Sequence, residues 1–256
     1  MKKITNAMVV ILLVCGIITP ICAQEDEAPK TQMLAIHADH VLPAKAAEYE
    51  AATKALKDVL EKYEIKDVSY RTLTQSNGNY LYVDYIDNFA ELDKNLFGTL
   101  KEKMPEADWI AMWKKFDGCY YEHEDFIARY HPDLSYHAEE LTEEMKYRMW
   151  DFMYFEEKDW DNVMAMAKKW KELYESKKAG GGYTIYTNGF GMEGPVIVVH
   201  SWAKSEADHV AIDSKDNELL GDDAGKLWQE TVKYIYKQEK ITGRSRADLS
   251  YIPTQE

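Results

Sequence analysis

The sequence predicts an α+β fold made of two similar lobes in tandem, each with the element order strand, helix, strand, strand, helix, strand. The tetrapeptide Asp-Leu-Ser-Tyr at residues 133–136 recurs 115 residues later, at residues 248–251. Identical residues recur upstream at the same spacing: Trp113 and Trp228, Tyr121 and Tyr236, Arg129 and Arg244. Matches that keep one register over about sixty residues predict a tandem duplication.

The first half begins with a predicted strand at residues 33–41, where apolar residues alternate with others. Pro43 suits the first turn of a helix, and apolar residues follow it at spacings of three and four as far as Tyr63. Residues 67–74 and 79–86 are rich in strand-forming residues and flank Ser-Asn-Gly, a strong hairpin signal.

The rest of the chain continues and then repeats this pattern. Asn88 suits the cap of a helix that runs through Phe97. The other predicted elements are a helix at 106–117, strands at 125–136 and 150–155, a helix at 159–174, strands at 182–187 and 195–202, helices at 205–211 and 222–236, and a closing strand at 241–251.

Residues 1–23 have the layout of a secretory signal peptide. Lys2 and Lys3 precede an apolar run from Met8 to Ile18, and Ala23 is a small residue suited to cleavage. The run is too short and wrongly flanked for a stable membrane span. We therefore expect an exported chain, periplasmic or extracellular. Its expected parts are a disordered leader at 24–32, lobe 1 at 33–137, a linker at 138–147 and lobe 2 at 148–252.

The chain is acidic, with a formal charge of −14 from 31 basic and 45 acidic residues. Loss of Lys2 and Lys3 with the signal would take this charge to −16. Phosphate backbones repel such a chain, and it has no basic stripe, so we expect no nucleic-acid partner. Cys119 is the only cysteine beyond residue 23. This excludes an intramolecular disulfide framework and favours a buried, apolar role for Cys119.

Two patterns resemble cofactor or metal motifs but lack the required context. Residues 189–194 spell G-x-G-x-x-G, which binds dinucleotides only where it links a strand to a helix. A strand is predicted to follow here, so these glycines are interpreted as the second hairpin turn. His37 and His40 differ by three and would face opposite ways on a strand. We predict neither a cofactor nor a metal.

The order βαββαβ is that of the ferredoxin-like split βαβ unit, whose small sheet has helices on one face and needs a partner for the other. A second copy in the same chain supplies that partner. The tandem pattern, with an added helix before the closing strand, resembles the dimeric α/β-barrel superfamily, which includes antibiotic-biosynthesis monooxygenase-like and NIPSNAP-like proteins. The resemblance rests on element order and duplication over about residues 33–252. It implies a pseudo-twofold intrachain α/β barrel. Its haem-degrading members use an Asn, Trp and His set, and no motif assigns those roles to positions here.

The duplicated aromatic and arginine residues form the candidate ligand site: Trp113, Trp228, Tyr121, Tyr236, Arg129 and Arg244. An arginine beside an aromatic wall suits an anionic group of a partly apolar ligand. The structural interpretation is simpler. Arg129 and Arg244 precede Asp133 and Asp248 by four residues and would share a strand face with them, which favours salt bridges.

His37 and His200 are the candidate catalytic residues, because the positions 115 residues away hold Phe152 and Tyr85. A strand histidine that faces solvent or bonds the backbone is the plainer alternative. The leading hypothesis is an exported protein that binds a small, partly apolar molecule between sheet and helices. The alternatives are a cofactor-independent monooxygenase-like enzyme, which the resemblance implies, and a structural or assembly protein without a ligand. A homo-oligomer is compatible with all three.

Overall fold

The computed structural model describes residues 31–137 and 141–254. The expected signal peptide at 1–23 and the leader as far as residue 30 lie outside the described residues, and both stay predictions. Within the described ranges, none of the helices is both long enough and apolar enough to cross a bilayer.

Lobe 1 has the predicted element order. It consists of β1 (Gln32–Val41), α1 (Ala46–Lys62), β2 (Arg71–Gln75), β3 (Asn79–Ile86), α2 (Gly98–Lys103), α3 (Glu106–Trp113) and β4 (Tyr120–Tyr136), with short 3-10 turns at Pro43–Lys45, Phe89–Asp93 and Lys114–Phe116. Gly78 has a φ of +94°, which suits it to the β2–β3 turn. Asn88 caps as predicted by accepting the N–H of Ala90. The helix it begins is only a 3-10 turn, because the backbone is extended again at Lys94.

Lobe 2 repeats this order. It consists of β5 (Tyr147–Phe155), α4 (Trp160–Lys177), β6 (Tyr183–Asn188), β7 (Val196–Ala203), α5 (Glu206–Thr231) and β8 (Ile235–Ser245), with a 3-10 turn at Glu157–Asp159. The two helices predicted before the closing strand both lie within α5, which non-helical backbone divides at Gly221, where φ is +51°. The first of them is longer than predicted, because it continues past residue 211 to Leu220. Tyr236 belongs to β8 and not to a helix, because β8 pairs with β5 from Ile235 onward. The glycine-rich segment 189–194 links β6 to β7, so the turn interpretation is confirmed.

The eight strands form one closed antiparallel barrel in the order β1-β3-β2-β8-β5-β7-β6-β4. Each lobe contributes four adjacent strands in the same internal order, β4-β1-β3-β2 and β8-β5-β7-β6. The lobes meet at two seams, where β2 pairs with β8 and β4 pairs with β6. The closing strand of each lobe thus pairs with the second strand of the other lobe. This confirms the predicted pair of ferredoxin-like lobes in one barrel.

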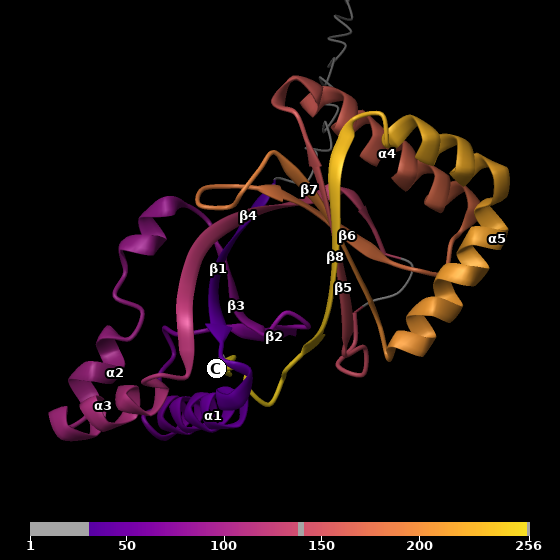
Figure 1. Ribbon diagram of the computed structural model, residues 1–256. Coiled ribbons are helices and arrows are strands. Elements are labelled where there is room, and N and C mark those ends of the chain that lie inside the picture. The colour runs from indigo at the N-terminus through magenta and orange to yellow at the C-terminus, as the bar shows by residue number, and fades with distance from the viewer. Residues whose placement is uncertain (1–30, 138–140, 255–256) are drawn as a thin grey trace, which may run out of the picture.

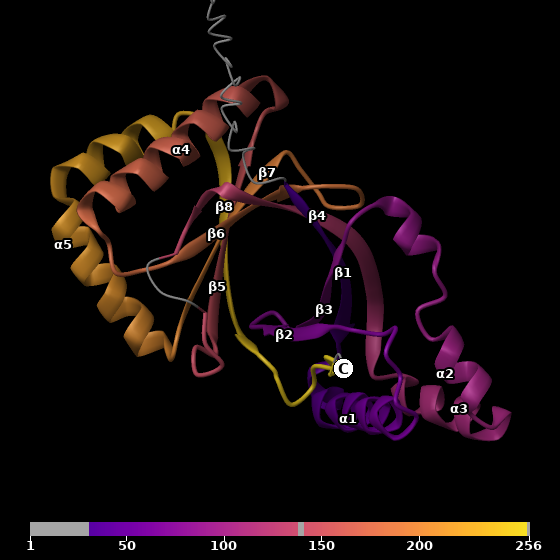
Figure 2. The ribbon, with the colours of Figure 1, turned by 180° about the vertical axis from the view of Figure 1, so that it is seen from behind.

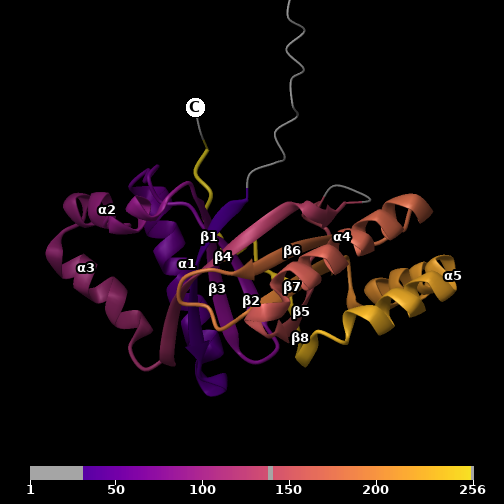
Figure 3. The same cartoon turned by 90° about the horizontal axis from the view of Figure 1, so that it is seen from above.

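The helices cover the barrel from outside in two groups (Figure 1). Helices α1, α2 and α3 lie against lobe 1, and α4 and α5 lie on the opposite side of the strands, as the view from above shows (Figure 3). After β8 the chain crosses back to lobe 1 and passes beside α1 (Figure 2), where the Tyr251 hydroxyl lies 3.3 Å from the Leu60 carbonyl. Tyr251 fixes this segment by donating its hydroxyl hydrogen to the carbonyl of Ile65 at 2.6 Å.

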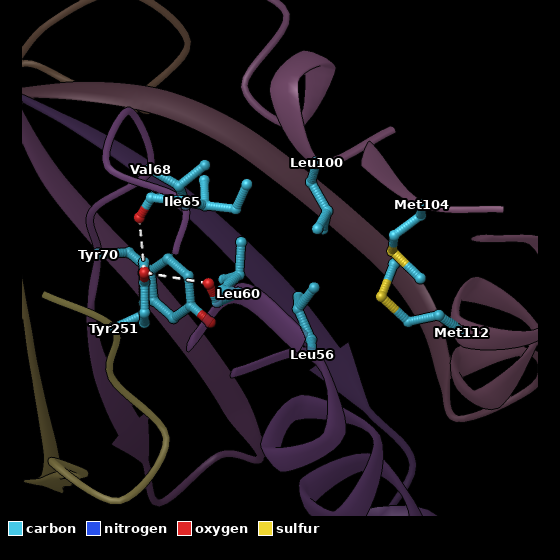
Figure 4. Packing of buried hydrophobic residues seen from close by; sticks show 9 residues of the cluster. All are labelled: Leu56, Leu60, Ile65, Val68, Tyr70, Leu100, Met104, Met112 and Tyr251. Atoms are coloured by element: carbon cyan, nitrogen blue, oxygen red, sulfur yellow. Dashed lines mark hydrogen bonds between the residues drawn. The ribbon is translucent and has the colours of Figure 1, made fainter. Parts of the chain in front are cut away.

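Each lobe has a core between its sheet and its helices. The lobe 1 core consists of Leu56, Leu60, Ile65, Val68, Tyr70, Leu100, Met104, Met112 and Tyr251 (Figure 4). In lobe 2, α4 contributes Val163 and Ala167, which pack against Met153, Ile185 and Ile197 of the sheet. A further cluster, on the opposite face of the lobe 2 strands, lies inside the barrel. It joins Trp150, Tyr154, Val196 and Val198 to Leu73 of β2. The burial of each such side chain contributes about 1.5–3 kcal/mol.

The repeated Asp-Leu-Ser-Tyr segment ties each lobe to the other. The Ser135 hydroxyl oxygen accepts the N–H of Ile185 on β6 at 2.9 Å, and that of Ser250 accepts the N–H of Thr72 on β2 at 2.8 Å. Each hydroxyl also donates to the carbonyl four residues earlier, at 2.7 and 2.8 Å. Both copies therefore serve the same structural contact across a seam.

Gly243 is the position at which the β2–β8 seam tolerates no side chain. A Cβ there would overlap the carbonyl oxygen of Thr74 and approach the ring of Trp150. Because backbone atoms cannot move aside without opening the seam, we expect Gly243→Ala to lower the free energy of unfolding by about 3 kcal/mol. Denaturant unfolding measures this change.

Gly225 in α5 supplies the matched control, because an added Cβ there meets nothing within 4 Å. Alanine favours a helix over glycine by about 1 kcal/mol. Gly225→Ala should therefore leave stability unchanged or raise it. Equal stability of the two variants would contradict a seam that depends on Gly243.

Candidate functional site

The predicted aromatic wall does not form in one place. Trp113 packs among aromatic side chains in the lobe 1 core, and Trp228 packs in the lobe 2 core. Tyr121 and Tyr236 lie near the starts of β4 and β8 and expose 67% and 64% of their surface. The structure thus brings the tryptophans into two separate cores and leaves the tyrosines on the surface.

Arg129 and Arg244 are exposed on the two closing strands, each next to a seam. The salt bridge predicted between Arg244 and Asp248 is wrong, since the Asp248 carboxylate accepts hydrogen bonds from Arg246 at 2.9 and 2.8 Å. The same-face rule fails because β8 ends at Ser245 and the chain turns there. Within the described ranges, Arg129 forms no ion pair with its own aspartate either.

His37 lies on the outer face of β1 between two carboxylates. Its Nδ1 is 2.8 Å from Oδ1 of Asp125 on β4, and its Nε2 is 3.2 Å from Oδ1 of Asp39. Asp39 is buried and accepts a short hydrogen bond from the Tyr49 hydroxyl on α1, which in turn lies 2.7 Å from the Tyr82 hydroxyl. The imidazole is thus the half-exposed end of a chain of ionic and hydrogen-bonded contacts that runs beneath α1.

These contacts set the protonation state of His37. Burial acts to lower its pKa, but the hydrogen bonds and charges of Asp39 and Asp125 outweigh burial and raise the pKa to about 9. His37 is therefore cationic at neutral pH and cannot accept a further proton as a general base. Its contacts instead hold β1, β4 and α1 together.

His200 projects from β7 into the barrel and is only 8% exposed. Its Nδ1 lies 2.9 Å from the Thr184 hydroxyl, and its ring stacks on Trp150 with centroids 5.3 Å apart. Its Nε2 is buried without a hydrogen-bond partner among the described atoms. Burial, followed by the positive charge of Arg148, lowers the pKa of His200 to about 3. This imidazole is neutral at physiological pH and a weak base.

The strand registers show which residues of the opposite lobe are equivalent to His37 and His200, and they differ from those expected. They give Asp151 and Val83, in place of Phe152 and Tyr85, as the counterparts of His37 and His200. The uniform 115-residue spacing holds only for the closing strands, because connecting segments differ in length between the lobes.

The inner face of the barrel differs between the lobes. Lobe 1 contributes Leu34, Ile36 and Val83, whereas the equivalent positions of lobe 2 hold Arg148, Trp150 and His200. The fold therefore needs no polar group at these positions. The polar set is a feature of lobe 2 alone, and it lies near the β2–β8 seam.

A groove of about 480 Å³ lies where this seam meets the start of β5 and the end of β7. Lobe 1 contributes Ser76 to its wall, and lobe 2 contributes Lys146, Tyr147, Lys204 and Arg244. The Ser76 N–H donates to the Thr242 carbonyl at 2.7 Å, and the Ser245 N–H donates to the Lys146 carbonyl at 2.9 Å. Backbone hydrogen bonds thus hold the walls in place.

The groove concentrates positive charge in an acidic chain. Three cations and one carboxylate, Glu206, line it. Lys204 pairs with Glu144 at 3.1 Å on the surface. Lys146 and Arg244 form no ion pair within residues 31–137 and 141–254. Their charge is therefore available to an anion.

The corresponding edge of lobe 1 carries different residues. Lys146 and Lys204 directly flank the paired residues Tyr147 and Ala203, whereas Gln32 and Asp87 flank the equivalent pair in lobe 1. The groove lysines are thus specific to lobe 2.

Sequence reasoning identified Arg244 but missed Lys146, Lys204 and Arg148. The signal was present in the predicted element order, because the first and third strands of a split βαβ unit are adjacent and antiparallel. The residue before β5 and the residue after β7 must then lie at one edge. Both are lysines.

The pairing of His37 predicts a pH-dependent stability. Its pKa rises from 6.5 in the unfolded chain to about 9 in the fold. The stabilisation is therefore fully present below about pH 6.5, declines as pH rises, and is lost above about pH 9. We expect His37→Gln to lower the free energy of unfolding by about 1 kcal/mol at pH 6, since solvent screens the half-exposed ring.

Denaturant unfolding of both proteins between pH 6 and 10 checks this sign, and the difference should vanish at the alkaline end. His123→Gln is the matched control, because its ring lies 5.5 Å from His37 but forms no ion pair among the described residues. A constant difference across this range for His37→Gln would contradict the assigned pairing.

No known protein-family model matches this sequence, and no curated protein matches it. Solved structures share its fold. A candidate monooxygenase from Lactobacillus acidophilus is 10% identical, with coverage of 88% of this chain and 97% of its own and a TM-score of 0.52. An anthrone oxidase-like protein is 9% identical, with coverage of 86% and 93% and a TM-score of 0.55. A candidate monooxygenase from Fusobacterium nucleatum is 10% identical, with coverage of 88% and 99% and a TM-score of 0.53.

At these identities the likeness concerns the fold alone. The shared architecture is the closed barrel of eight antiparallel strands with helices outside. The chain therefore has the fold of a dimeric α/β barrel, with both ferredoxin-like lobes in one chain.

Proposed function

We propose that this protein binds a small anionic molecule in the groove at the β2–β8 seam. The observation that carries the proposal is the convergence of Lys146 and Arg244 on one concave surface, without acidic partners in the described ranges. A chain with a formal charge of −14 has many carboxylates that could have neutralised them. Their free charge supports recognition of an external anion.

The groove offers complementary means of holding an anion. The Arg244 guanidinium presents a planar fork of N–H donors that suits a carboxylate or a phosphate, and the lysines add compact charges. Tyr147 supplies a half-buried ring for an organic portion of the ligand. The volume of about 480 Å³ falls within the range of about 300–1,000 Å³ that is typical of small-molecule sites.

Ligand binding was also the leading hypothesis from the sequence. The proposed site is now the groove and not the space between sheet and helices. In the described residues, core side chains fill the layers between sheet and helices, and Trp113 and Trp228 belong to those cores. Arg244 keeps its expected role as an anchor. Small-ligand binding is consistent with the monooxygenase-type neighbours, although their likeness concerns the fold.

The monooxygenase-like alternative required His37 or His200 as a base. Paired carboxylates raise the pKa of His37 to about 9, and burial lowers the pKa of His200 to about 3. An efficient general base has a pKa near the working pH. Neither histidine meets this condition, and binding is therefore the function that the site supports better.

Isothermal titration of the protein with citrate and with inorganic phosphate at low ionic strength tests the proposal. We expect at least one probe to bind, with an affinity that falls as salt is added. Arg244→Gln and Lys146→Gln should each weaken binding about tenfold, equivalent to about 1.4 kcal/mol.

Arg129→Gln is the matched control, because Arg129 occupies the equivalent position on the closing strand of lobe 1. Its binding constants should equal those of the unaltered protein. The absence of binding by both probes, or an equal loss in Arg129→Gln and Arg244→Gln, would overturn the proposal.

A further inference from the structure

Arg148 and His200 lie next to each other on the inner face of the barrel. Arg148 is opposite Trp202, and His200 is opposite Trp150, on the paired strands β5 and β7. Two residues in this diagonal relation have side chains that start about 7 Å apart on one face of the sheet. That face is internal, because the interior cluster joins Trp150 to Leu73 of the other lobe.

Arg148 is a buried cation without a counter-charge. It is 5% exposed, and its Nη1 donates to the carbonyls of Met145 and Tyr147, the latter at 2.9 Å. A guanidinium has five N–H donors. No carboxylate pairs with it in residues 31–137 or 141–254. Burial lowers the pKa of Arg148 to about 10, which leaves it charged at neutral pH.

His200 adds an unused nitrogen to the same place. It is more than nine-tenths buried, and its Nε2 has no partner among the described atoms. The Thr184 hydroxyl lies 2.9 Å from Nδ1 and 3.4 Å from the carbonyl oxygen of His200. When it donates to Nδ1, the nearer acceptor, the proton of the neutral ring is on Nε2. In this tautomer His200 presents a donor to the interior.

We propose that a small monovalent anion, such as a halide or a simple carboxylate, binds inside the barrel between the Arg148 guanidinium and Nε2 of His200. A buried charge without a counter-charge is destabilising, and a buried donor without an acceptor adds to this destabilisation. One anion relieves both. The site is distinct from the groove, since it uses different side chains and lies on the inner face.

The lobe comparison shows that the fold does not require these groups. The equivalent residues in lobe 1 are Leu34 and Val83, and the barrel closes around them in the same way. The polar pair of lobe 2 therefore makes the fold less stable than an apolar pair would. A bound anion offsets this loss of stability.

Crystals of the unaltered protein grown with sodium bromide test the site without any substitution. We expect an anomalous bromide peak within hydrogen-bonding distance of both the Arg148 guanidinium and His200 Nε2. A water molecule at that position, or bromide peaks confined to the surface and the groove, would overturn the proposal.

Thermal unfolding in sodium bromide and in sodium gluconate at equal ionic strength supplies an independent measurement. We expect a stabilisation specific to bromide, which Arg148→Leu, the lobe 1 residue, should abolish. Arg244→Leu separates this site from the groove. Equal effects of the two salts, or a bromide effect that Arg244→Leu removes and Arg148→Leu leaves intact, would contradict an interior anion.

Discussion

The rest of this structure depends on one interaction, the pairing of each lobe's closing strand with a strand of the other lobe. Because β8 pairs with β2 and β4 pairs with β6, neither four-stranded sheet has a free edge. The inner faces then become one shared interior. A single lobe would expose that face and both edges to water, and a sheet of this size is stable only when such a face is covered. The lobes are therefore interdependent.

The two seams are equivalent in topology but differ in their surroundings. At the β4–β6 seam, the glycine-rich loop after β6 lies along β4, where the Gly189 N–H donates to the Ile127 carbonyl at 2.8 Å. At the β2–β8 seam the corresponding connection is the short turn that contains Gly78. A short turn leaves this edge uncovered, and the groove with Lys146 and Arg244 occupies it. The shorter connection thus leaves the groove open at this seam.

The sequence was informative about elements that depend on local pattern and on the repeat. The alternation in β1, the helical spacing in α1 and the Asp-Leu-Ser-Tyr repeat predicted the two lobes and their order. The strand conformation of Tyr236 could not be predicted, because pairing of β8 with β5 overrides the local helical pattern. The candidate site was predicted only through Arg244. Arg148 could not be recognised, since its significance comes from burial and from the lack of a carboxylate nearby, which are properties of the folded barrel.

Amide hydrogen exchange under native conditions tests the interdependence of the lobes most directly. We predict that amides bonded across the β2–β8 seam, such as those of Arg246 and Ser76, exchange only through global unfolding, with the same free energy as the core of β5. Exchange of both seams at a much lower free energy, while β1 and β5 stay protected, would contradict the account. Each lobe would then hold its structure alone, and the barrel would be an association of two independent units.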